Sequence, residues 1–270
     1  MMMKRIDFHS HGCWGIDDGV KDEQEALLFL REAKESGITT LFCTPHMIPR
    51  GKYDTRPEDI CEAVIRLRTL AEFNKIEVQV LKGSEFHLNE YALEWYNNGM
   101  CVPYEGTNLL LVELDKYKTY QRTVDDWMYE MSRDTMKLMI AHPERYFTSS
   151  DVMFKQAKEW IKNGYYLQIN RTSLLGLDSP LIATMAWKLV KKGYVHIISS
   201  DAHHGEGKRI CRLDDVYDAL VAKIGKTKTD ILFVENPNRI LRGEELITID
   251  RTPLTFWEFI NEKLFRIKLY

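Results

Sequence analysis

The sequence lacks the features that place a protein in a membrane or outside the cell. Its longest apolar runs, such as residues 109–112, fall far short of the roughly 20 residues needed to cross a bilayer. No apolar stretch of signal-peptide length precedes Arg5. The five cysteines are odd in number and never form a Cys-x-x-Cys pair, which argues against a disulfide framework or a thiolate zinc site. We therefore expect a cytoplasmic protein with reduced thiols and no transmembrane segment.

An excess of positive charge and the signatures of covalent catalysis are also missing. The 37 Lys and Arg residues are balanced by 40 Asp and Glu residues, and no basic run stands out. None of the cysteines is followed six positions later by an arginine, as the phosphate loop of cysteine phosphatases requires. Neither Gly-x-Ser-x-Gly nor a P-loop sequence is present. We therefore expect no nucleic-acid partner and no covalent cysteine or serine intermediate.

The residues that are present alternate between short apolar runs and amphipathic segments, which is typical of βα units around a parallel sheet. Strands are predicted at residues 5–8, 39–43, 77–83, 108–112, 136–141, 165–169 and 195–199. Helices are predicted at residues 23–36, 57–73, 123–133, 150–163 and 179–192. This pattern predicts an α/β fold with a barrel-like domain over residues 1–247.

A C-terminal extension over residues 248–270 is predicted to be an amphipathic helix. Trp257, Ile260, Leu264 and Ile267 recur at helical spacing and would form an apolar face that must be buried. The face could dock on the barrel, on another copy of the chain, or on a partner or membrane surface. We expect it to contribute packing or assembly, including a homo-oligomer, rather than chemistry.

Metal-ligand residues follow six of the seven predicted strands. They are His9 with His11, His46, Glu85, Glu113, His142, and Asp201 with His203, while the sixth strand offers Gln168 and Asn170. In parallel βα barrels the functional groups gather at the carboxyl ends of the strands, because these ends converge on one face. The pattern predicts a metal site at that face.

Each of these residues has an ordinary structural explanation when it is taken alone. A lone histidine near a strand end, such as His87 or His196, is most often hydrogen-bonded structure, so both are left out of the ligand set. Asp201 could be a helix N-cap. His9 and His11 can bind one ion only if the strand has ended, since alternate strand residues face opposite sides. Six coincidences at successive strand ends favour the metal site.

The number of candidate ligands indicates more than one ion. Asp18, from Asp17-Asp18-Gly19, brings the set to nine, which exceeds the four to six that one ion accepts. Imidazole and carboxylate without thiolate suit zinc, manganese or iron. At least two divalent ions are implied. If three divalent ions are bound, their positive charge exceeds the negative charge of the four carboxylates, and the excess matches a phosphate dianion.

These residues resemble the PHP superfamily, named for polymerase and histidinol phosphatase domains, whose fold is a distorted (β/α)7 TIM-like barrel with a trinuclear metal site at the C-terminal ends of the strands. Within it, the sequence is similar to the manganese-dependent tyrosine-protein phosphatases of bacterial capsule and exopolysaccharide biosynthesis, of the CpsB/YwqE type, over roughly residues 4–245. The motifs that carry the resemblance are His9-Ser10-His11, Asp17-Asp18-Gly19, Thr44-Pro45-His46, Glu85, Glu113, Ala141-His142-Pro143-Glu144-Arg145-Tyr146, Gln168-Ile169-Asn170, Ser200-Asp201-Ala202-His203 and Phe233-Val234-Glu235-Asn236-Pro237.

The resemblance implies that two or three divalent ions, Mn2+ with iron or zinc as alternatives, are bound by nine ligands. These are His9, His11, Asp18, His46, Glu85, Glu113, His142, Asp201 and His203, with Asp17 as the alternative to Asp18. Arg145 and Arg209 are the predicted catalytic residues. Arg145 lies three residues after His142, where a guanidinium could pair with phosphate oxygens. Arg209 follows His204-Gly205-Glu206-Gly207, where the family usually has a shorter loop.

The resemblance further implies hydrolysis of phosphotyrosine in proteins by a metal-bridged hydroxide, in the regulation of capsular or exopolysaccharide biosynthesis. The expected partner is a tyrosine-phosphorylated protein, such as a bacterial tyrosine autokinase. One alternative is a small-molecule phosphoesterase such as histidinol-phosphate phosphatase, which would have nearly the same site chemistry. A third interpretation is a non-catalytic metal-binding interaction module.

Overall fold

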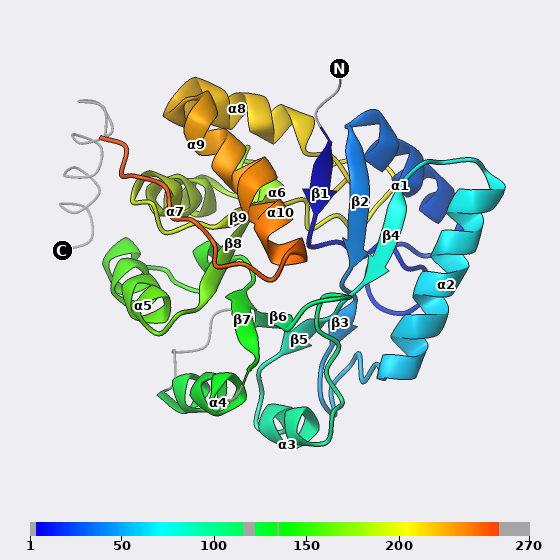
Figure 1. Ribbon diagram of the computed structural model, residues 1–270, viewed down its shortest axis with the longest axis horizontal. Helices are drawn as coiled ribbons and strands as arrows, with labels where there is room; N and C mark the ends of the chain where they lie inside the picture. Colours follow the sequence, from blue (N-terminus) through cyan, green and yellow to red (C-terminus); the bar gives the residue numbers. More distant parts are fainter. Residues whose placement is uncertain (1–3, 116–121, 134, 254–270) are drawn as a thin grey trace.

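The computed structural model describes residues 4–115, 122–133 and 135–253, and every strand pair in it is parallel. One sheet contains β1 (Arg5–Asp7), β2 (Ile38–Cys43) and β4 (Gln79–Lys82) in that order. The other contains β3 (His46–Met47), β5 (Glu85–His87), β6 (Leu109–Glu113), β7 (Lys137–Ile140), β8 (Tyr166–Asn170) and β9 (Ile197–Ser199). A parallel bridge between Ser10 and Ala202 joins the ends of β1 and β9. Together the two sheets therefore curl into the TIM-like α/β barrel predicted from the sequence (Figure 1).

Two of the predicted strands are longer than expected, because each continues after a break. Pro45, which has no N–H to donate, separates β2 from β3, and Gly83 separates β4 from β5. The two segments stay side by side across these breaks, since Glu85 N donates to the Pro45 carbonyl at 3.1 Å. His46, Glu85 and Glu113 were expected just after strand ends, and this detail is wrong. His46 and Glu85 lie inside β3 and β5, directly opposite each other in the register, and Glu113 is the last residue of β6.

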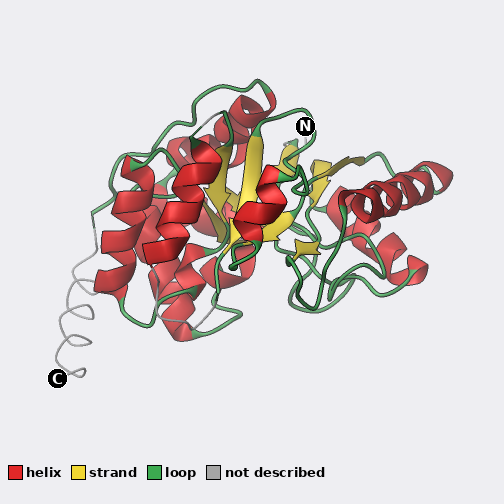
Figure 2. Cartoon of the chain, turned by 90° about the horizontal axis from the view of Figure 1, so that it is seen from below, coloured by secondary structure: helices red, strands yellow, loops and turns green. Residues whose placement is uncertain are grey.

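Helices surround the strands (Figure 2). The predicted helices are confirmed as α1 (Glu23–Glu35), α2 (Pro57–Phe73), α4 (Arg122–Ser132), α5 (Ser150–Lys162) and α7 (Pro180–Lys191). Their starts follow local chemistry: the Ser179 side chain caps α7 by accepting from Ile182 N at 3.2 Å, with Pro180 in the first turn. Among the helices of the described residues, none is long and apolar enough to cross a membrane.

Several elements, most of them short, are not predicted by the sequence pattern. They are α3 (Ala92–Asn97), the 3-10 turn η1 (Pro143–Arg145), α6 (Arg171–Leu174), α8 (Asp214–Ile224), α9 (Lys226–Asp230), the π-helical turn η2 (Ile231–Glu235) and α10 (Asn236–Leu241). Asn236 is buried and donates to the carbonyls of His196 and Ile247, each at 2.8 Å. This side chain therefore ties the C-terminal helices to the barrel, where η2 contacts β1 and β9 and leads into α10.

The chain beyond residue 247 continues to pack on the barrel as far as it is described. Ile249 is buried, and Thr252 N donates to the Lys191 carbonyl at 2.8 Å. Residues 254–270, which carry most of the predicted amphipathic helix, lie outside the described residues. The domain boundary at residues 247/248 and the helix beyond it stay predictions.

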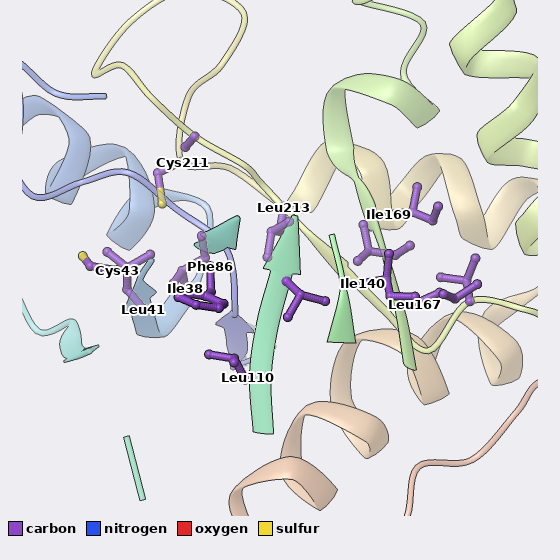
Figure 3. Packing of buried hydrophobic residues seen from close by; sticks show 14 of the residues in the cluster. Ile38, Leu41, Cys43, Phe86, Leu110, Ile140, Leu167, Ile169, Cys211 and Leu213 are labelled. Carbon is purple, nitrogen blue, oxygen red and sulfur yellow. The ribbon is translucent and has the colours of Figure 1, made fainter. Parts of the chain in front are cut away.

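The core has two layers, because successive strand side chains point to opposite faces. The larger layer joins the outer face of the strands to the helices, and Figure 3 shows part of it, including Leu41, Phe86, Leu110, Ile140 and Leu167. The smaller layer fills the barrel interior with Phe8, Phe42, Tyr104, Leu109, Leu111, Met139 and Tyr166. The Phe8 and Phe42 rings stack at 4.6 Å, and Tyr104 meets both edge-on. This aromatic cluster fills the barrel interior beneath the polar carboxyl ends of the strands.

Candidate metal centre

The inward side chains become polar toward the carboxyl ends of the strands. On β6, Leu109, Leu111 and Glu113 share one face, so the apolar interior passes directly into a carboxylate. On β8, Tyr166 is followed on the same face by Gln168 and Asn170. The barrel interior therefore ends in a polar layer of buried side chains.

The nine predicted ligands all lie in this layer. They form four overlapping groups whose ligand atoms lie within 4.8 Å of one another: His11, Asp18, His46 and His203; His9, Glu85 and His142; His9, His11 and Asp201; and His46, Glu85 and Glu113. Most of these side chains are buried, but that of Asp18 is 47% exposed and that of His46 is 11% exposed. The cluster is therefore open to solvent on the side of Asp18 and His46.

Glu85 is the centre of the cluster. Its carboxylate lies 2.7–3.3 Å from ring nitrogens of His9, His11, His46 and His142. Burial alone would raise the pKa of Glu85, but the surrounding imidazoles hold it well below its ordinary value. Buried carboxylates are costly unless positive charge compensates them. A donor set of four carboxylates and five imidazoles, converging in this way, fits divalent cations without thiolate ligands.

The backbone is strained at two of these positions. His142 has φ 33° and Asp201 has φ 50°, both in the left-handed region that non-glycine residues seldom adopt. Each residue lies just after a strand end, beyond β7 and β9 respectively. Strain of this kind costs about 1–3 kcal/mol per residue and persists where the surroundings enforce it, often at functional sites. The fold therefore enforces an unusual backbone at both positions, and this conformation aims both side chains at the cluster.

The requirement that β1 end before the His9-Ser10-His11 motif is met. The strand stops at Asp7, and the two histidines turn toward each other with their Nε2 atoms 3.3 Å apart. Ser10 points elsewhere and donates to the Phe42 carbonyl at 2.8 Å. Both imidazoles can therefore face one ion.

The structure places Asp17 and Asp18 in different positions. Asp18 Oδ1 lies 3.4 Å from His46 Nε2 and 3.6 Å from His203 Nε2, within one of the ligand groups. Asp17 lies behind the cluster, where its Oδ2 is 2.6 Å from His11 Nδ1, the ring atom opposite the one that faces Glu85. A carboxylate in this position fixes the tautomer and orientation of a metal-binding histidine. Asp17 therefore faces the outer ring nitrogen of His11, and Asp18 faces the ligand group.

Gln168 and Asn170 contact two other candidate ligands, His9 and Asp201. Gln168 Oε1 lies 3.0 Å from His9 Nδ1, and Gln168 Nε2 donates to Asn170 Oδ1 at 2.7 Å. Asn170 Nδ2 then donates to Asp201 Oδ2. The one strand without a predicted ligand therefore supplies a hydrogen-bonded chain from His9 to Asp201. The amides in the Gln168-Ile169-Asn170 motif were the available sequence signal for this role.

Both predicted catalytic arginines contact Asp201. Its Oδ2 accepts from Arg145 Nη1 at 3.1 Å and lies 2.9 Å from Arg209 Nη2, while its Oδ1 lies 3.4–3.6 Å from His9, His11 and His203. Burial raises and Arg209 lowers the pKa of Asp201, and the net shift is to well below its ordinary value. Asp201 therefore bridges the histidines and the two guanidinium groups.

The two arginines differ in exposure. Arg145 is mostly buried and also bonds Thr172 Oγ1 at 3.2 Å and Asp178 Oδ2 at 2.9 Å, a partner that the sequence did not indicate. Its Nε is buried without a hydrogen-bond partner among the described residues. Arg209 is about one-third exposed. Arg209 therefore lies at the solvent side of Asp201, and Arg145 at the inner side.

The two histidines left out of the ligand set occupy different environments. His196 is buried away from the ligand groups and accepts from Leu167 N at 3.0 Å, so it is structural. Burial lowers its pKa to about 4. His87 lies 3.4 Å from the Glu113 carboxylate and 3.3 Å from Asp115, so it touches the cluster from outside.

Comparison with known proteins places the chain among bacterial capsule proteins. The family profile described as "Capsular polysaccharide synthesis, CpsB/CapC" matches residues 5–242. Tyrosine-protein phosphatase CpsB of Streptococcus pneumoniae is 27% identical over 244 residues, covering 88% of this chain and 99% of the relative. Tyrosine-protein phosphatase YwqE of Bacillus subtilis (strain 168) is 24% identical over 250 residues, covering 92% and 94%.

A solved structure has the same fold. It comes from work on YwqE from Bacillus subtilis and CpsB from Streptococcus pneumoniae, described as unique metal-dependent tyrosine phosphatases. Its TM-score is 0.82 at 24% identity, and the match covers 93% of this chain and 99% of that one. Because the family profile spans most of the sequence, the chain belongs to the CpsB/CapC family of capsular polysaccharide synthesis proteins.

Proposed function

We propose that this protein is a metal-dependent protein-tyrosine phosphatase. The observation that carries the proposal is the convergence of nine imidazole and carboxylate ligands at the open end of the barrel. Relatives that match almost their full length to this chain are named tyrosine-protein phosphatases, which gives the reaction class. We further propose that the chain acts in the cytoplasm on a tyrosine-phosphorylated protein, such as a bacterial tyrosine autokinase, in the regulation of capsular or exopolysaccharide biosynthesis.

The residues that would hold the ions are the nine members of the four ligand groups. They are His9, His11, Asp18, His46, Glu85, Glu113, His142, Asp201 and His203, for two or three ions, proposed to be manganese with iron or zinc as alternatives. When bound, such ions polarise phosphoryl oxygens and lower the pKa of a water that serves as the nucleophile. Asp17 and Gln168 would keep His11 and His9 in the ligand orientation.

The arginines would neutralise the phosphoryl group. Arg209 is exposed enough to meet an incoming phosphate, and Arg145 has a buried Nε–H that is free to donate among the described residues. A guanidinium can make paired, charge-assisted hydrogen bonds to phosphate oxygens, which strengthen as charge develops there. The leaving tyrosinate has a pKa of about 10, so it departs more easily than the alkoxide of a serine ester. These features suit an aryl phosphate.

Access to the cluster is compatible with a protein substrate. Asp18 is 47% exposed and Arg209 is about one-third exposed, and this exposure supports access for a side chain that projects from a protein surface.

Turnover of three substrates tests the proposal. The metal-loaded protein is assayed with a phosphotyrosine peptide, the same peptide with phosphoserine, and histidinol phosphate. We expect the phosphotyrosine peptide to be hydrolysed at least about 10²-fold faster, by kcat/KM, than either alternative. Glu85→Gln should abolish this activity, whereas Glu105→Gln, remote from the cluster and paired with Arg68, is the matched control. Faster turnover of histidinol phosphate would indicate a small-molecule phosphoesterase, and no turnover by fully metal-loaded protein would indicate an interaction module.

A further inference from the structure

The loop at residues 48–54 follows β3, the strand that carries His46, and leads to α2 (Figure 1). It closes on itself, because Ile48 N donates to the Tyr53 carbonyl at 2.8 Å and Gly51 N donates to the Ile48 carbonyl at 2.9 Å. A Cβ at Gly51 would lie 2.3 Å from Ile48 Cγ2, so this close approach requires glycine. Arg50 has φ 54° and donates its backbone N–H to Asp54 Oδ1 at 2.9 Å. The loop therefore has one tightly defined shape.

The loop is also anchored to the body of the protein. The Arg50 guanidinium lies over the Tyr91 ring at 4.3 Å and pairs with the Glu94 carboxylate at 2.9 and 3.1 Å. Asn89 Nδ2 donates to the Pro49 carbonyl at 2.8 Å. These contacts involve none of the candidate ligands. The position of the loop is therefore set independently of the metal centre.

This loop presents Tyr53 at the open side of the cluster. The Tyr53 ring is nearly parallel to the His46 ring, with centroids 5.7 Å apart and an interplanar angle of 7°. Lys52 Nζ lies 4.6 Å from the Tyr53 centroid and is solvent-exposed. An aromatic ring beside His46, with an exposed cation over it, therefore lies at the open side of the cluster.

His46 has several contacts besides Tyr53 that hold it in place. The His46 ring already contacts Asp18, Glu85 and Glu113 at 3.0–3.5 Å. Its backbone N–H donates to Asp17 Oδ2 at 2.9 Å. The half-buried Tyr53 ring is therefore available for a different task.

We propose that Tyr53 and Lys52 form the subsite for the aryl group of the substrate. The tyrosyl ring packs against Tyr53 in an offset or edge-to-face arrangement while its phosphate reaches the metal centre. Lys52 moves off the Tyr53 ring into solvent or onto an acidic neighbour of the phosphotyrosine. This inference rests on the proposed function and deepens it, because it explains how the site would prefer a phosphate carried on a flat ring to one carried on a short alkyl chain.

The test measures binding separately from turnover. Metal-loaded wild type, Tyr53→Ala and Tyr53→Phe are titrated by calorimetry with two ligands: a peptide containing the non-hydrolysable residue phosphonomethylphenylalanine, and inorganic phosphate. Metal content is measured on every sample. Tyr129→Ala, at an exposed tyrosine on α4, is the surface control. Lys52→Ala removes the cation but keeps the ring.

We expect Tyr53→Ala to weaken binding of the aryl phosphonate peptide about tenfold, and Tyr53→Phe to change it less than about threefold. Inorganic phosphate affinity and metal content should stay within about twofold in both variants. In Lys52→Ala, the ratio of the affinity for the aryl phosphonate peptide to the affinity for inorganic phosphate should stay as in wild type. Equal weakening of peptide and phosphate, or loss of metal, would show that Tyr53 acts by positioning His46 and would overturn the inference.

The two proposals fail in different ways. If wild type hydrolyses phosphotyrosine peptides and Tyr53→Ala binds the aryl phosphonate as tightly as wild type does, the aryl subsite is wrong and the proposed function stands. If metal-loaded wild type hydrolyses no phosphotyrosine peptide, the proposed function is wrong, and Tyr53-dependent binding would then describe an aryl-phosphate binding site without this turnover.

Discussion

Asp17→Asn removes one negative charge behind the metal centre while keeping the size of the side chain. The carboxylate accepts from three groups: His11 Nδ1 at 2.6 Å, His46 N at 2.9 Å and Gly19 N at 2.9 Å. An asparagine has only one acceptor atom, so its amide group must face at least one of these donors. Burial would raise the pKa of Asp17, but His11 and His46 hold it below its ordinary value, so the native group is ionised.

The size of the effect follows from these contacts. Losing a charge-assisted hydrogen bond and leaving a buried donor unpaired costs about 1.5–3 kcal/mol. That energy corresponds to about 10- to 10²-fold in an equilibrium constant, the range typical for removing a group that orients a metal ligand. We therefore expect Asp17→Asn to bind metal about 10- to 10²-fold more weakly than wild type. The fold should be retained, because the Asp17 contacts involve the site and not the packed core.

Chelator competition measures this affinity directly, with metal content read by elemental analysis at each chelator concentration. Asp18→Asn removes a proposed ligand and should be at least as damaging. Asp22→Asn is the control, since Asp22 caps α1 and asparagine caps helices about as well. Wild-type affinity in Asp17→Asn would refute the orienting role. A much larger loss in Asp17→Asn than in Asp18→Asn would show that Asp17 is the ligand.

Three further variants test other parts of the account. Arg145→Ala should keep normal metal content and lower kcat/KM by about 10²-fold, because a contact to the transferring group is lost; unchanged kinetics would leave only its structural pairing with Asp201. Neutral His196, with a pKa of about 4 against about 6.5 when unfolded, contributes stability that is lost as pH falls from about 6.5 to about 4, by about 3 kcal/mol in total. His196→Gln should flatten this acid dependence in urea unfolding between pH 7 and pH 5, and an unchanged slope would contradict the reasoning. A chain ending at Pro253 keeps the buried Ile249 and should retain turnover within several-fold; loss of turnover in a folded, metal-loaded truncation would assign the tail a role at the active site.

The strands and the two faces of the barrel could be read from the sequence because their signals are local. Alternation along β6 places Leu109, Leu111 and Glu113 on one face whatever the rest of the chain does. The break at Pro45 is different. The proline itself is visible in the sequence, but the strand resumes after it only because β3 pairs with β5, so the sequence could not show that His46 lies inside a strand.

The ligand set was visible as a pattern, but the assignment between adjacent aspartates was not. Asp17 and Asp18 have the same chemistry, and only the orientation of the His11 ring decides which of them faces the cluster. The helices from Asp214 to Leu241 were missed for a related reason. Those after α8 are short, and contacts such as those of Asn236 with residues distant in sequence hold them in place.

The most direct test of the central claim is a titration of metal-free protein with Mn2+, following turnover of a phosphotyrosine peptide and bound metal together. The account predicts no turnover without metal, and recovery that saturates at two or three ions per chain. Treatment of the loaded protein with a thiol alkylator should change little, because Cys13, Cys43 and Cys211 are buried and none lies in the ligand groups. Full turnover after exhaustive metal removal, or saturation with metal without any turnover, would contradict the account.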